Sequence, residues 1–369
     1  MATAAPPSTP PSTPSSTEGQ VVHDPIPFDR FETHEFPAGD GRILNLKHLA
    51  PELQTVKEPV LMIGGTGSRA NLFNPPTKNL LKVLSSKGFD VWLLNWRSSI
   101  DVPAVAYTLD DAAVLDMPKA VQAVRDRTGA DTIKAIIHCQ GSCAFMMAIT
   151  AGLIKNVSLV VSNSSALHPV MPWQARLKLP IAVAFLNREN ITGINPQWGL
   201  YAPRLLPKIL RWYVEATHDE CDNPVCKQCS FMYGYGFPTL WRHENLNDAT
   251  HEWIKGEFGQ VPMSYYGQIA DSSVAGELVS MGKYRQQLPP LFTAAPPKTD
   301  ARFVFMTGDM NQTFLPVGMG RTFEYFERHQ PGRHTFQKFA GYGHLDVFLG
   351  EHSHRDVFPF IVDELSKPW

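Results

Sequence analysis

The feature that most constrains the fold is a repeated alternation of apolar strands with amphipathic helices. Four stretches have the pattern of a strand that is apolar on both faces: PVLMIGG (59–65), FDVWLLNW (89–96), TIKAIIH (132–138) and SLVVSNSS (158–165). Helical spacing separates them, in residues 77–88 and 108–129. Strands buried on both faces and alternating with helices predict an α/β fold, with a mostly parallel central sheet covered by helices on both faces.

The alternation also predicts how the chain is divided. A hairpin over residues 31–48 should form one edge of the sheet. The pattern stops near residue 166, in a stretch rich in Pro, Trp and Tyr, and resumes near residue 301 with ARFVFMTGD. The expected parts are a disordered tail (1–20), the first part of the core (21–165), an inserted cap (166–300) and the second part of the core (301–369).

Composition excludes two classes of partner. A formal net charge of -2 leaves no basic field for nucleic acid, and no apolar run has the length of a transmembrane span. Residues 1–20 have neither the basic start nor the apolar stretch of a signal peptide. We therefore expect a cytoplasmic protein, in which thiols serve as nucleophiles, core residues or metal ligands more often than as disulfides.

The word IHCQG, residues 137–141, marks the junction of a central strand with a buried helix. In the nucleophile elbow G-x-S-x-G, the central side chain is exposed at such a turn and attacks the substrate. Here Cys139 takes the place of the serine, and Gly141 provides the small residue that follows. Ile137 departs from the small residue expected before the nucleophile. Cys139 is the predicted nucleophile, and an inert buried thiol is the alternative.

A thiol that attacks an acyl carbon needs a base, and the base needs a group to orient it. Asp309 follows a late strand, and His344 lies in a glycine-flanked loop after the last strand. The order nucleophile, acid, histidine is that of the elbow enzymes. The sequence therefore predicts the triad Cys139, Asp309 and His344, and Asp346 is a rival acid better suited to steadying the loop.

A glycine-rich loop after the first long strand provides the expected oxyanion hole. Glycines let backbone N–H groups approach a developing negative charge, so Gly65 and Thr66 are the predicted donors, together with the N–H of Gln140. His138 and Ser142, on either side of the elbow, are expected to contact substrate. The loop has the spacing of neither common phosphate-binding motif, and no nucleotide or other cofactor is expected.

Longer stretches resemble a known group of proteins. The words IHCQGSCAFMM, HDECDNPVC, PTLWRHENLNDATHEW, PKTDARFVFMTGDMNQTF and GYGHLDVF are similar to α/β hydrolases found beside or fused to glucose-methanol-choline (cholesterol-oxidase-like) oxidoreductases. The resemblance implies an α/β-hydrolase fold and an oxidoreductase of that class as a partner. A shorter resemblance, through DVWLLNWRSS, TLDD and the cysteine elbow, is to polyhydroxyalkanoate synthases, which use G-x-C-x-G.

The inserted cap holds a second group of thiols, in HDECDNPVCKQC. Cys221, Cys226 and Cys229, with His218 nearby and His243 and His251 downstream, are a possible zinc-binding set. Against zinc, the C-x4-C-x2-C run lacks two paired C-x2-C halves, and an iron–sulfur site lacks its fourth cysteine. A structural cap loop without metal is the favoured interpretation.

These features predict a cysteine-dependent hydrolase that cleaves an ester, thioester or lactone of a lipid-like or other apolar substrate through an acyl-enzyme on Cys139. An aromatic-rich cap suits an apolar acyl or sterol pocket. Transfer of the acyl group to an alcohol, as in a polyhydroxyalkanoate synthase, is the first alternative. A non-catalytic partner of a flavin oxidoreductase is the second, although a scaffold has no need of a complete triad.

Overall fold

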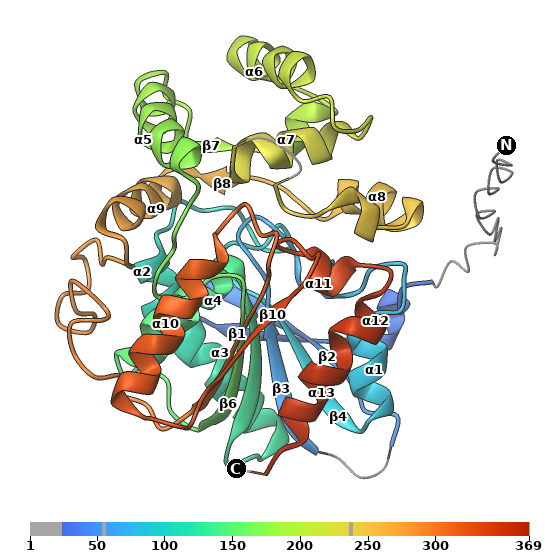
Figure 1. Cartoon of the computed structure of the whole chain (residues 1–369), viewed down its shortest axis with the longest axis vertical. Coiled ribbons are helices and arrows are strands. Elements are labelled where there is room, and N and C mark those ends of the chain that lie inside the picture. Colours follow the sequence, from blue (N-terminus) through green and yellow to red (C-terminus); the bar gives the residue numbers. More distant parts are fainter. Residues whose placement is uncertain (1–23, 54–56, 236–238, 369) are drawn as a thin grey trace, which may run out of the picture.

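The computed structural model describes residues 24–53, 57–235 and 239–368, so the expected tail over residues 1–20 lies outside the described residues. An eight-stranded sheet runs through the molecule in the order β1-β2-β4-β3-β5-β6-β9-β10 (Figure 1). Its strands are β1 Glu32–Pro37, β2 Ile43–Leu49, β3 Lys57–Ile63, β4 Phe89–Asn95, β5 Ile133–His138, β6 Val157–Asn163, β9 Arg302–Gly308 and β10 Thr335–Phe339. The predicted strands are confirmed.

One strand, β2, runs against its neighbours, and all other strand pairs from β4 to β10 are parallel. The hairpin of β1 and β2 lies at the sheet edge, as predicted. Side chains of β4, β5 and β6 are buried along their whole length. The central strands therefore have no face toward solvent, which explains why apolar residues predominate on both of their faces.

Helices cover both faces of this sheet. The helices of the core are α1 Leu80–Ser86, α2 Leu109–Asp111, α3 Met117–Thr128, α4 Cys139–Thr150, α10 Pro316–His329, α11 Asp346–Leu349, α12 Ser353–Asp356 and α13 Phe358–Ser366, with short helical turns at Phe28–Arg30 and Ala70–Phe73. The connection from β3 to β4 runs toward β2, whereas those from β4 to β5 and from β5 to β6 run the other way. Because parallel crossovers are right-handed, α1 lies on one face and α3 and α4 lie on the other (Figure 1).

Two helical segments are interrupted, one of them the predicted helix over residues 108–129. Residues 108–129 form α2, a π-helical turn over Ala112–Asp116 and then α3. The turn immediately precedes Pro118, which has no N–H to donate to the carbonyl four residues earlier. The last helical segment, residues 353–366, is divided into α12 and α13 at Val357.

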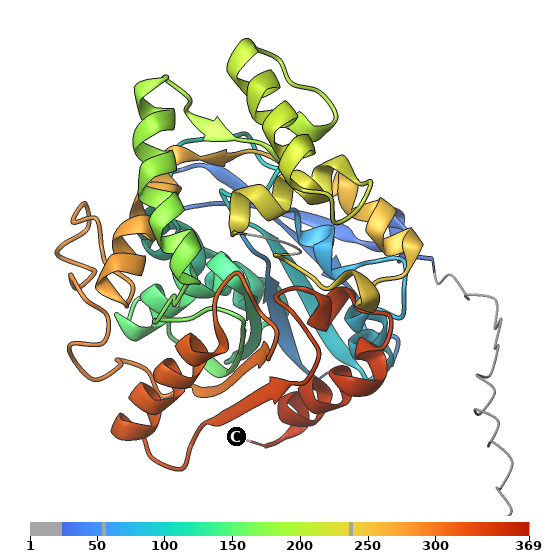
Figure 2. The ribbon, with the colours of Figure 1, turned by 45° about the horizontal axis from the view of Figure 1, so that its top comes forward.

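The residues between β6 and β9 supply a separate layer, which we call the insertion (residues 166–300). Its elements are α5 Trp173–Arg188, β7 Gly193–Ile194, α6 Leu205–Thr217, α7 Pro224–Tyr233, α8 Asp248–Trp253, β8 Val261–Pro262 and α9 Met263–Ala275, with short turns Pro196–Gly199, His243–Asn245 (η5) and Ile254–Gly256. Figure 1 shows these elements above one end of the sheet, and Figure 2 shows α5 and α6 standing apart on the outer side. Within the described residues, no helix combines the length and apolar character that crossing a membrane requires.

Candidate active site

The strand-to-helix turn at Cys139 has the backbone geometry of a nucleophile elbow. Cys139 follows the last residue of β5 and has a φ of 54°, in the left-handed region that side chains other than glycine rarely adopt. Such a conformation costs about 1–3 kcal/mol and persists at functional sites where the surroundings enforce it. The residue before the strand end, Ile137, is fully buried between β3 and β6 and does not prevent the turn.

Two glycines make room for this turn. A Cβ atom at Gly141 would lie 2.2 Å from the carbonyl oxygen of Gly64, so the first turn of α4 packs directly on the backbone that follows β3. A Cβ at Gly65 would lie 3.1 Å from the Cβ of Cys139. The glycine loop and the elbow therefore touch, and the nucleophile lies beside the backbone expected to form the oxyanion hole.

His344 is placed to act on the thiol. The Cys139 sulfur and one ring nitrogen each of His138 and His344 all lie within 4.8 Å of one another. The Nδ1 atom of His344 lies 3.2 Å from Oδ1 of Asn311, and its Nε2 atom is buried without a hydrogen-bond partner. The structure thus brings two of the three predicted triad residues together.

The partner of His344 is Asn311 and not the predicted Asp309. Asp309 is exposed, and its carboxylate accepts a hydrogen bond from the N–H of Gly341 at 2.8 Å. Asn311 is fully buried, and its Oδ1 also accepts from the backbone N–H groups of Thr313 and Phe314. The acid assigned from the sequence is therefore corrected: Asp309 joins two loops, and an amide oxygen orients the histidine.

This arrangement fixes the tautomer of His344. Backbone N–H groups only donate, so the Asn311 atom that they contact is the amide oxygen and must also accept from His344. The proton of the neutral imidazole therefore lies on Nδ1, which leaves the lone pair of Nε2 free to take a proton. The same logic operates in Cys-His-Asn sites of cysteine proteases.

Other residues hold the histidine loop. Asp346, the rival acid, is fully buried and accepts from the N–H of Gly343 and the side chain of Asn245. Burial raises the pKa of Asp346 to about 6. The hydroxyl of Ser164 donates to the carbonyl of His344 at 2.8 Å. Asp346 therefore steadies the loop, as predicted, and does not orient the imidazole.

Burial keeps both reacting groups neutral at rest. It lowers the pKa of His344 to about 3 and raises the pKa of the Cys139 thiol well above its ordinary value, with a smaller contribution from Cys143. The N–H of Gln140 opposes the rise at Cys139. Burial disfavours both the Cys139 thiolate and the His344 imidazolium, so the resting state is a thiol and a neutral imidazole. The proton moves to the imidazole only as the sulfur attacks.

The predicted oxyanion donors differ in whether they already have hydrogen-bond partners. The Thr66 hydroxyl is hydrogen-bonded to Ser98 and Tyr107, so of Thr66 only the predicted backbone N–H is left as a donor to the oxyanion. The backbone N–H of Gln140 contacts the Cys139 thiol. The Gln140 side chain is buried, with both amide atoms unpartnered. The sequence predicted only the backbone N–H of Gln140 as a donor and not this side-chain amide.

Ser142 and His138 lie in the core and not on the pocket wall. The Ser142 hydroxyl is 2.8 Å from that of Ser162 and is fully buried. The Nδ1 atom of His138 lies 2.8 Å from the side-chain nitrogen of Asn163, and its ring centroid is 4.8 Å from that of His344. The prediction that Ser142 lines the substrate site is wrong, because the first turn of α4 turns its side chain toward β6. His138 borders the base and is absent from the pocket wall.

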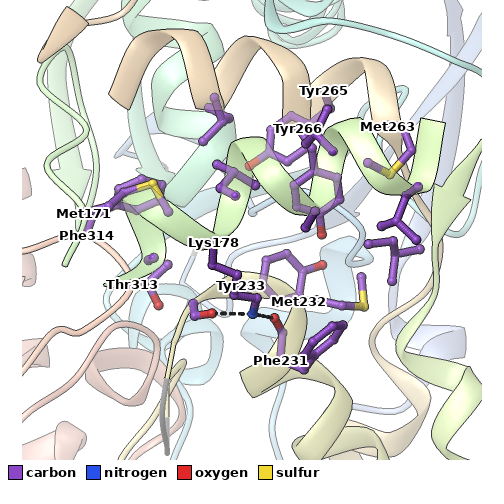
Figure 3. A pocket seen from close by; sticks show the side chains of 18 of the residues that line it. Met171, Lys178, Phe231, Met232, Tyr233, Met263, Tyr265, Tyr266, Thr313 and Phe314 are labelled. Carbon is purple, nitrogen blue, oxygen red and sulfur yellow. Dashed lines mark hydrogen bonds between the residues drawn. The ribbon is translucent and has the colours of Figure 1, made fainter. Parts of the chain in front are cut away.

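Cys139, which is 5% exposed, is one of the residues that line an apolar pocket. Figure 3 shows this pocket. The free space within it is about 60 Å³, below the usual range of small-molecule sites. The wall comes mostly from the insertion, with α5, α7 and α9 contributing, and from Thr313 and Phe314 of the core. Figure 3 shows aromatic rings of Tyr233 and Tyr266 turned into this space.

A lysine joins two walls of the pocket. The Lys178 ammonium, on α5, donates to the carbonyls of Phe231 and Gly234 at the end of α7 and lies 4.2 Å from the centre of the Phe231 ring (Figure 3). Burial lowers the pKa of Lys178 to about 8. The polar end of this side chain is thus used for holding α5 to α7, which leaves the pocket lining largely apolar.

Comparisons with known proteins agree with this architecture. No protein-family profile matches the chain. A protein of Schizosaccharomyces pombe named a probable lipase is 22% identical, over 91% of this chain and 77% of its own length. Human lipase member M is 27% identical over 40% of this chain and 41% of its own, and the poly(3-hydroxyalkanoate) polymerase subunit PhaC of Haloferax mediterranei is 28% identical over 32% and 25%.

Solved structures show the fold. DcsB in complex with a substrate analogue has a TM-score of 0.57 and 14% identity, over 91% of this chain and 98% of its own. A lipase in its open form has a TM-score of 0.56 with the same identity and coverage. The chain has the α/β-hydrolase fold, as predicted. The sequence relatives also support the prediction of an enzyme that acts on ester bonds.

Proposed function

We propose that this protein, with its α/β-hydrolase fold, is a cysteine hydrolase that cleaves an ester, thioester or lactone of a lipid-like acyl substrate. The observation that carries the proposal is the strained Cys139 backbone, which presents the sulfur to an apolar pocket within 4.8 Å of an imidazole nitrogen. The lipases among the sequence relatives support the choice of an ester bond.

In the proposed acylation step, Nε2 of His344 takes the thiol proton as the sulfur of Cys139 attacks the carbonyl carbon. The negative charge moves to the carbonyl oxygen, where the N–H groups of Gln140 and of Gly65 or Thr66 would stabilise it. When the intermediate collapses, the bond to the leaving oxygen or sulfur breaks, and the leaving group receives the proton from His344. The product of this step is a thioester on Cys139 and a free alcohol or thiol.

In the second step, His344 takes a proton from water, and the hydroxide attacks the thioester carbon. Collapse releases the carboxylic acid, and the sulfur recovers its proton from His344. Asn311 holds the imidazole in the tautomer that both steps need. No further reactant is required.

The surface of the insertion supports a lipid-like substrate. Trp173 and Ile181 on α5 are 67% and 70% exposed, and Leu205 and Trp212 on α6 are 74% and 69% exposed. Large apolar side chains grouped on an outer surface mark a place where apolar material binds. The same helix α5 lines the pocket with Ala175 and Leu179, so this surface and the site share one element.

Intact-mass spectrometry tests the proposal. The full chain is mixed with a series of ester and thioester substrates of increasing acyl length, and the mass of one acyl group should appear on the wild type and not on Cys139→Ala. Turnover should rise from acetyl toward longer chains because the pocket is apolar. Labelling that survives in Cys139→Ala, or equal turnover across the series, contradicts the proposal.

Transfer to an alcohol is the second candidate, because a poly(3-hydroxyalkanoate) polymerase subunit is among the relatives and a thioester intermediate can react with an alcohol as well as with water. Product analysis with an added alcohol distinguishes the two, since transfer yields a new ester and hydrolysis a free acid. A cytoplasmic location and an association with a glucose-methanol-choline oxidoreductase stay predictions. Co-purification from the source cells tests the association.

A further inference from the structure

The insertion contains a second group of thiols and imidazoles, far from Cys139 in the sequence. The sulfur atoms of Cys221 and Cys226 and one ring nitrogen each of His243 and His251 all lie within 4.8 Å of one another. We call these four residues the Cys2His2 cluster. They come from three places in the insertion: the loop and first turn of α7, the turn η5, and α8.

Local sequence builds this cluster. Asn223 is the N-cap of α7, and its Oδ1 accepts from the N–H groups of Val225 and Cys226, which sets the first turn that carries the second thiol. The Nδ2 of the same side chain donates to the carbonyl of His251 at 2.6 Å. One asparagine therefore fixes a cysteine and a histidine that lie in different elements.

Two observations describe the polar atoms of the cluster residues. The Nε2 atom of His251 is buried without a hydrogen-bond partner. The Cys226 sulfur lies 3.2 Å from Nε2 of His243, and the two imidazole rings stand nearly perpendicular, with centroids 4.8 Å apart. A buried ring nitrogen without a partner is costly unless a ligand takes its lone pair.

We propose that the Cys2His2 cluster binds one structural zinc ion. Two thiolates and two imidazoles are a common closed donor set for tetrahedral Zn²⁺. Bonds of about 2.3 Å to sulfur and about 2.0 Å to nitrogen place neighbouring donors of a tetrahedron roughly 3.3–3.8 Å apart. The observed limit of 4.8 Å and the 3.2 Å contact need only small side-chain movements to reach those values.

The sequence argued against zinc because the cysteine run lacks a second C-x2-C half. The fold supplies that half as His243 and His251 instead. Cys229, one turn after Cys226, is fully buried and its sulfur is outside the four-donor group. The cysteines of the proposed zinc site are therefore Cys221 and Cys226, and Cys229 is a core residue. The expectation of a cap loop without metal is revised by this proposal.

The zinc ion would stabilise the segments that form the pocket wall and that contact the loop of His344. The last residue of α7, Tyr233, lines the pocket and donates to the carbonyl of Thr66 at 3.1 Å. Near η5, the carbonyl of Leu240 accepts from the N–H of Leu345, and Asn245 donates to Asp346. The zinc-bearing segments thus contact residues adjacent to the oxyanion loop and to His344.

Elemental analysis of the full chain, purified under reducing conditions in the presence of zinc, tests the site. We expect one zinc per chain in the wild type, less than a tenth of that in Cys221→Ser and Cys226→Ser, and an unchanged content in Cys229→Ala. Cobalt exchanged into the wild type should give a sulfur-to-metal charge-transfer band that is absent from Cys226→Ser. Chelation should lower the melting temperature of the wild type and leave that of Cys226→Ser unchanged.

Two outcomes would overturn the site: a wild type that retains no zinc, and a wild type whose zinc content and cobalt spectrum are the same in Cys226→Ser. Peptide mapping that finds a Cys221–Cys226 disulfide in the reduced, zinc-treated protein contradicts it as well. Cys139→Ala separates this proposal from the hydrolase, because that variant should lose acyl labelling and keep its zinc.

Discussion

Two regions of this molecule pair cysteine with histidine and differ in almost every other respect. At the elbow, Cys139 has a φ of 54° and lies beside a pocket, with one imidazole as its base. In the insertion, Cys226 occupies the relaxed first turn of a capped helix, with a second thiol and two imidazoles around it. At the elbow, the side of the sulfur toward the pocket is open to substrate. In the cluster, the other thiol and the two imidazoles surround the sulfur.

The difference shows that the backbone conformation of a cysteine and the number of ligand atoms around its sulfur decide which role it can have. A thiol with one neutral base and space for a substrate is suited to attack. A thiol among three further donors, none of them facing the catalytic pocket, is suited to bind a metal. Residue type alone does not distinguish the two regions, since both contain buried cysteine and two histidines.

The largest effect should come from removing the elbow thiol. Cys139→Ala should lower kcat by at least about a thousandfold, because the nucleophile has no substitute in the pocket. The measurement is steady-state hydrolysis of the best ester from the series, with Cys229→Ala as a matched buried-thiol control that keeps near wild-type turnover. If Cys139→Ala keeps more than a tenth of the activity, the cysteine is a core residue.

The response of the elbow thiol to pH should be almost as large. Because burial raises the pKa of Cys139, its thiolate fraction is small at neutral pH and increases about tenfold per pH unit as protons are removed. Alkylation of Cys139, followed by peptide mass spectrometry, should therefore accelerate roughly a hundredfold between pH 7 and pH 9. A rate already constant from pH 6 upward would instead indicate a preformed thiolate and imidazolium pair.

A smaller effect is expected at the residue that orients the base. Asn311→Ala should reduce kcat on the order of tenfold to a hundredfold, since His344 then loses the acceptor that fixes its tautomer. Asp309→Ala should change kcat by less than about threefold, because its carboxylate contacts a loop N–H and not the imidazole. The reverse ranking of these two variants would restore the carboxylate as the third member of the triad.

The smallest effect is expected at Ser142. Its hydroxyl contacts Ser162, which itself donates to the carbonyl of Ser165. Ser142→Ala should therefore lower the free energy of unfolding by about 1 kcal/mol and leave acyl labelling at Cys139 intact. Chemical denaturation and intact-mass labelling of the same preparation measure both. An inactive, fully folded Ser142→Ala would make serine the better candidate for the nucleophile.

The sequence predicted the fold well where burial alone shapes the pattern. Strands such as β5, buried along its whole length, are mostly apolar on both faces, so their position and type could be read directly. The elbow was found for a similar reason, because a strand that passes straight into a buried helix needs a special turn. In both cases the determining contacts are local or repeat along the chain.

The partner of His344 and the histidines of the Cys2His2 cluster depend on contacts between residues far apart in the chain, which the sequence does not reveal. The sequence favours Asp309 because a carboxylate is the usual partner of a catalytic histidine, and nothing in the sequence marks Asn311, two residues later. Only the loop geometry, in which Thr313 and Phe314 hold the Asn311 oxygen, shows which side chain faces His344. The same is true of His243 and His251, which reach the two thiols only through the packing of α8 and η5 on α7.

The close contact between Gly141 and Gly64 limits how this chain can vary. A methyl group at position 141 would overlap a backbone oxygen that β3 cannot move without disturbing its pairing with β4 and β5. In a library that randomises residues 137–143 and is screened for folded protein, position 141 should accept glycine alone. Position 137, which departs from the usual elbow word, should accept other apolar residues that fit the core. In the elbow motif of this protein, position 141 is therefore restricted to glycine by a backbone contact, whereas position 137 is restricted only by the volume available in the core.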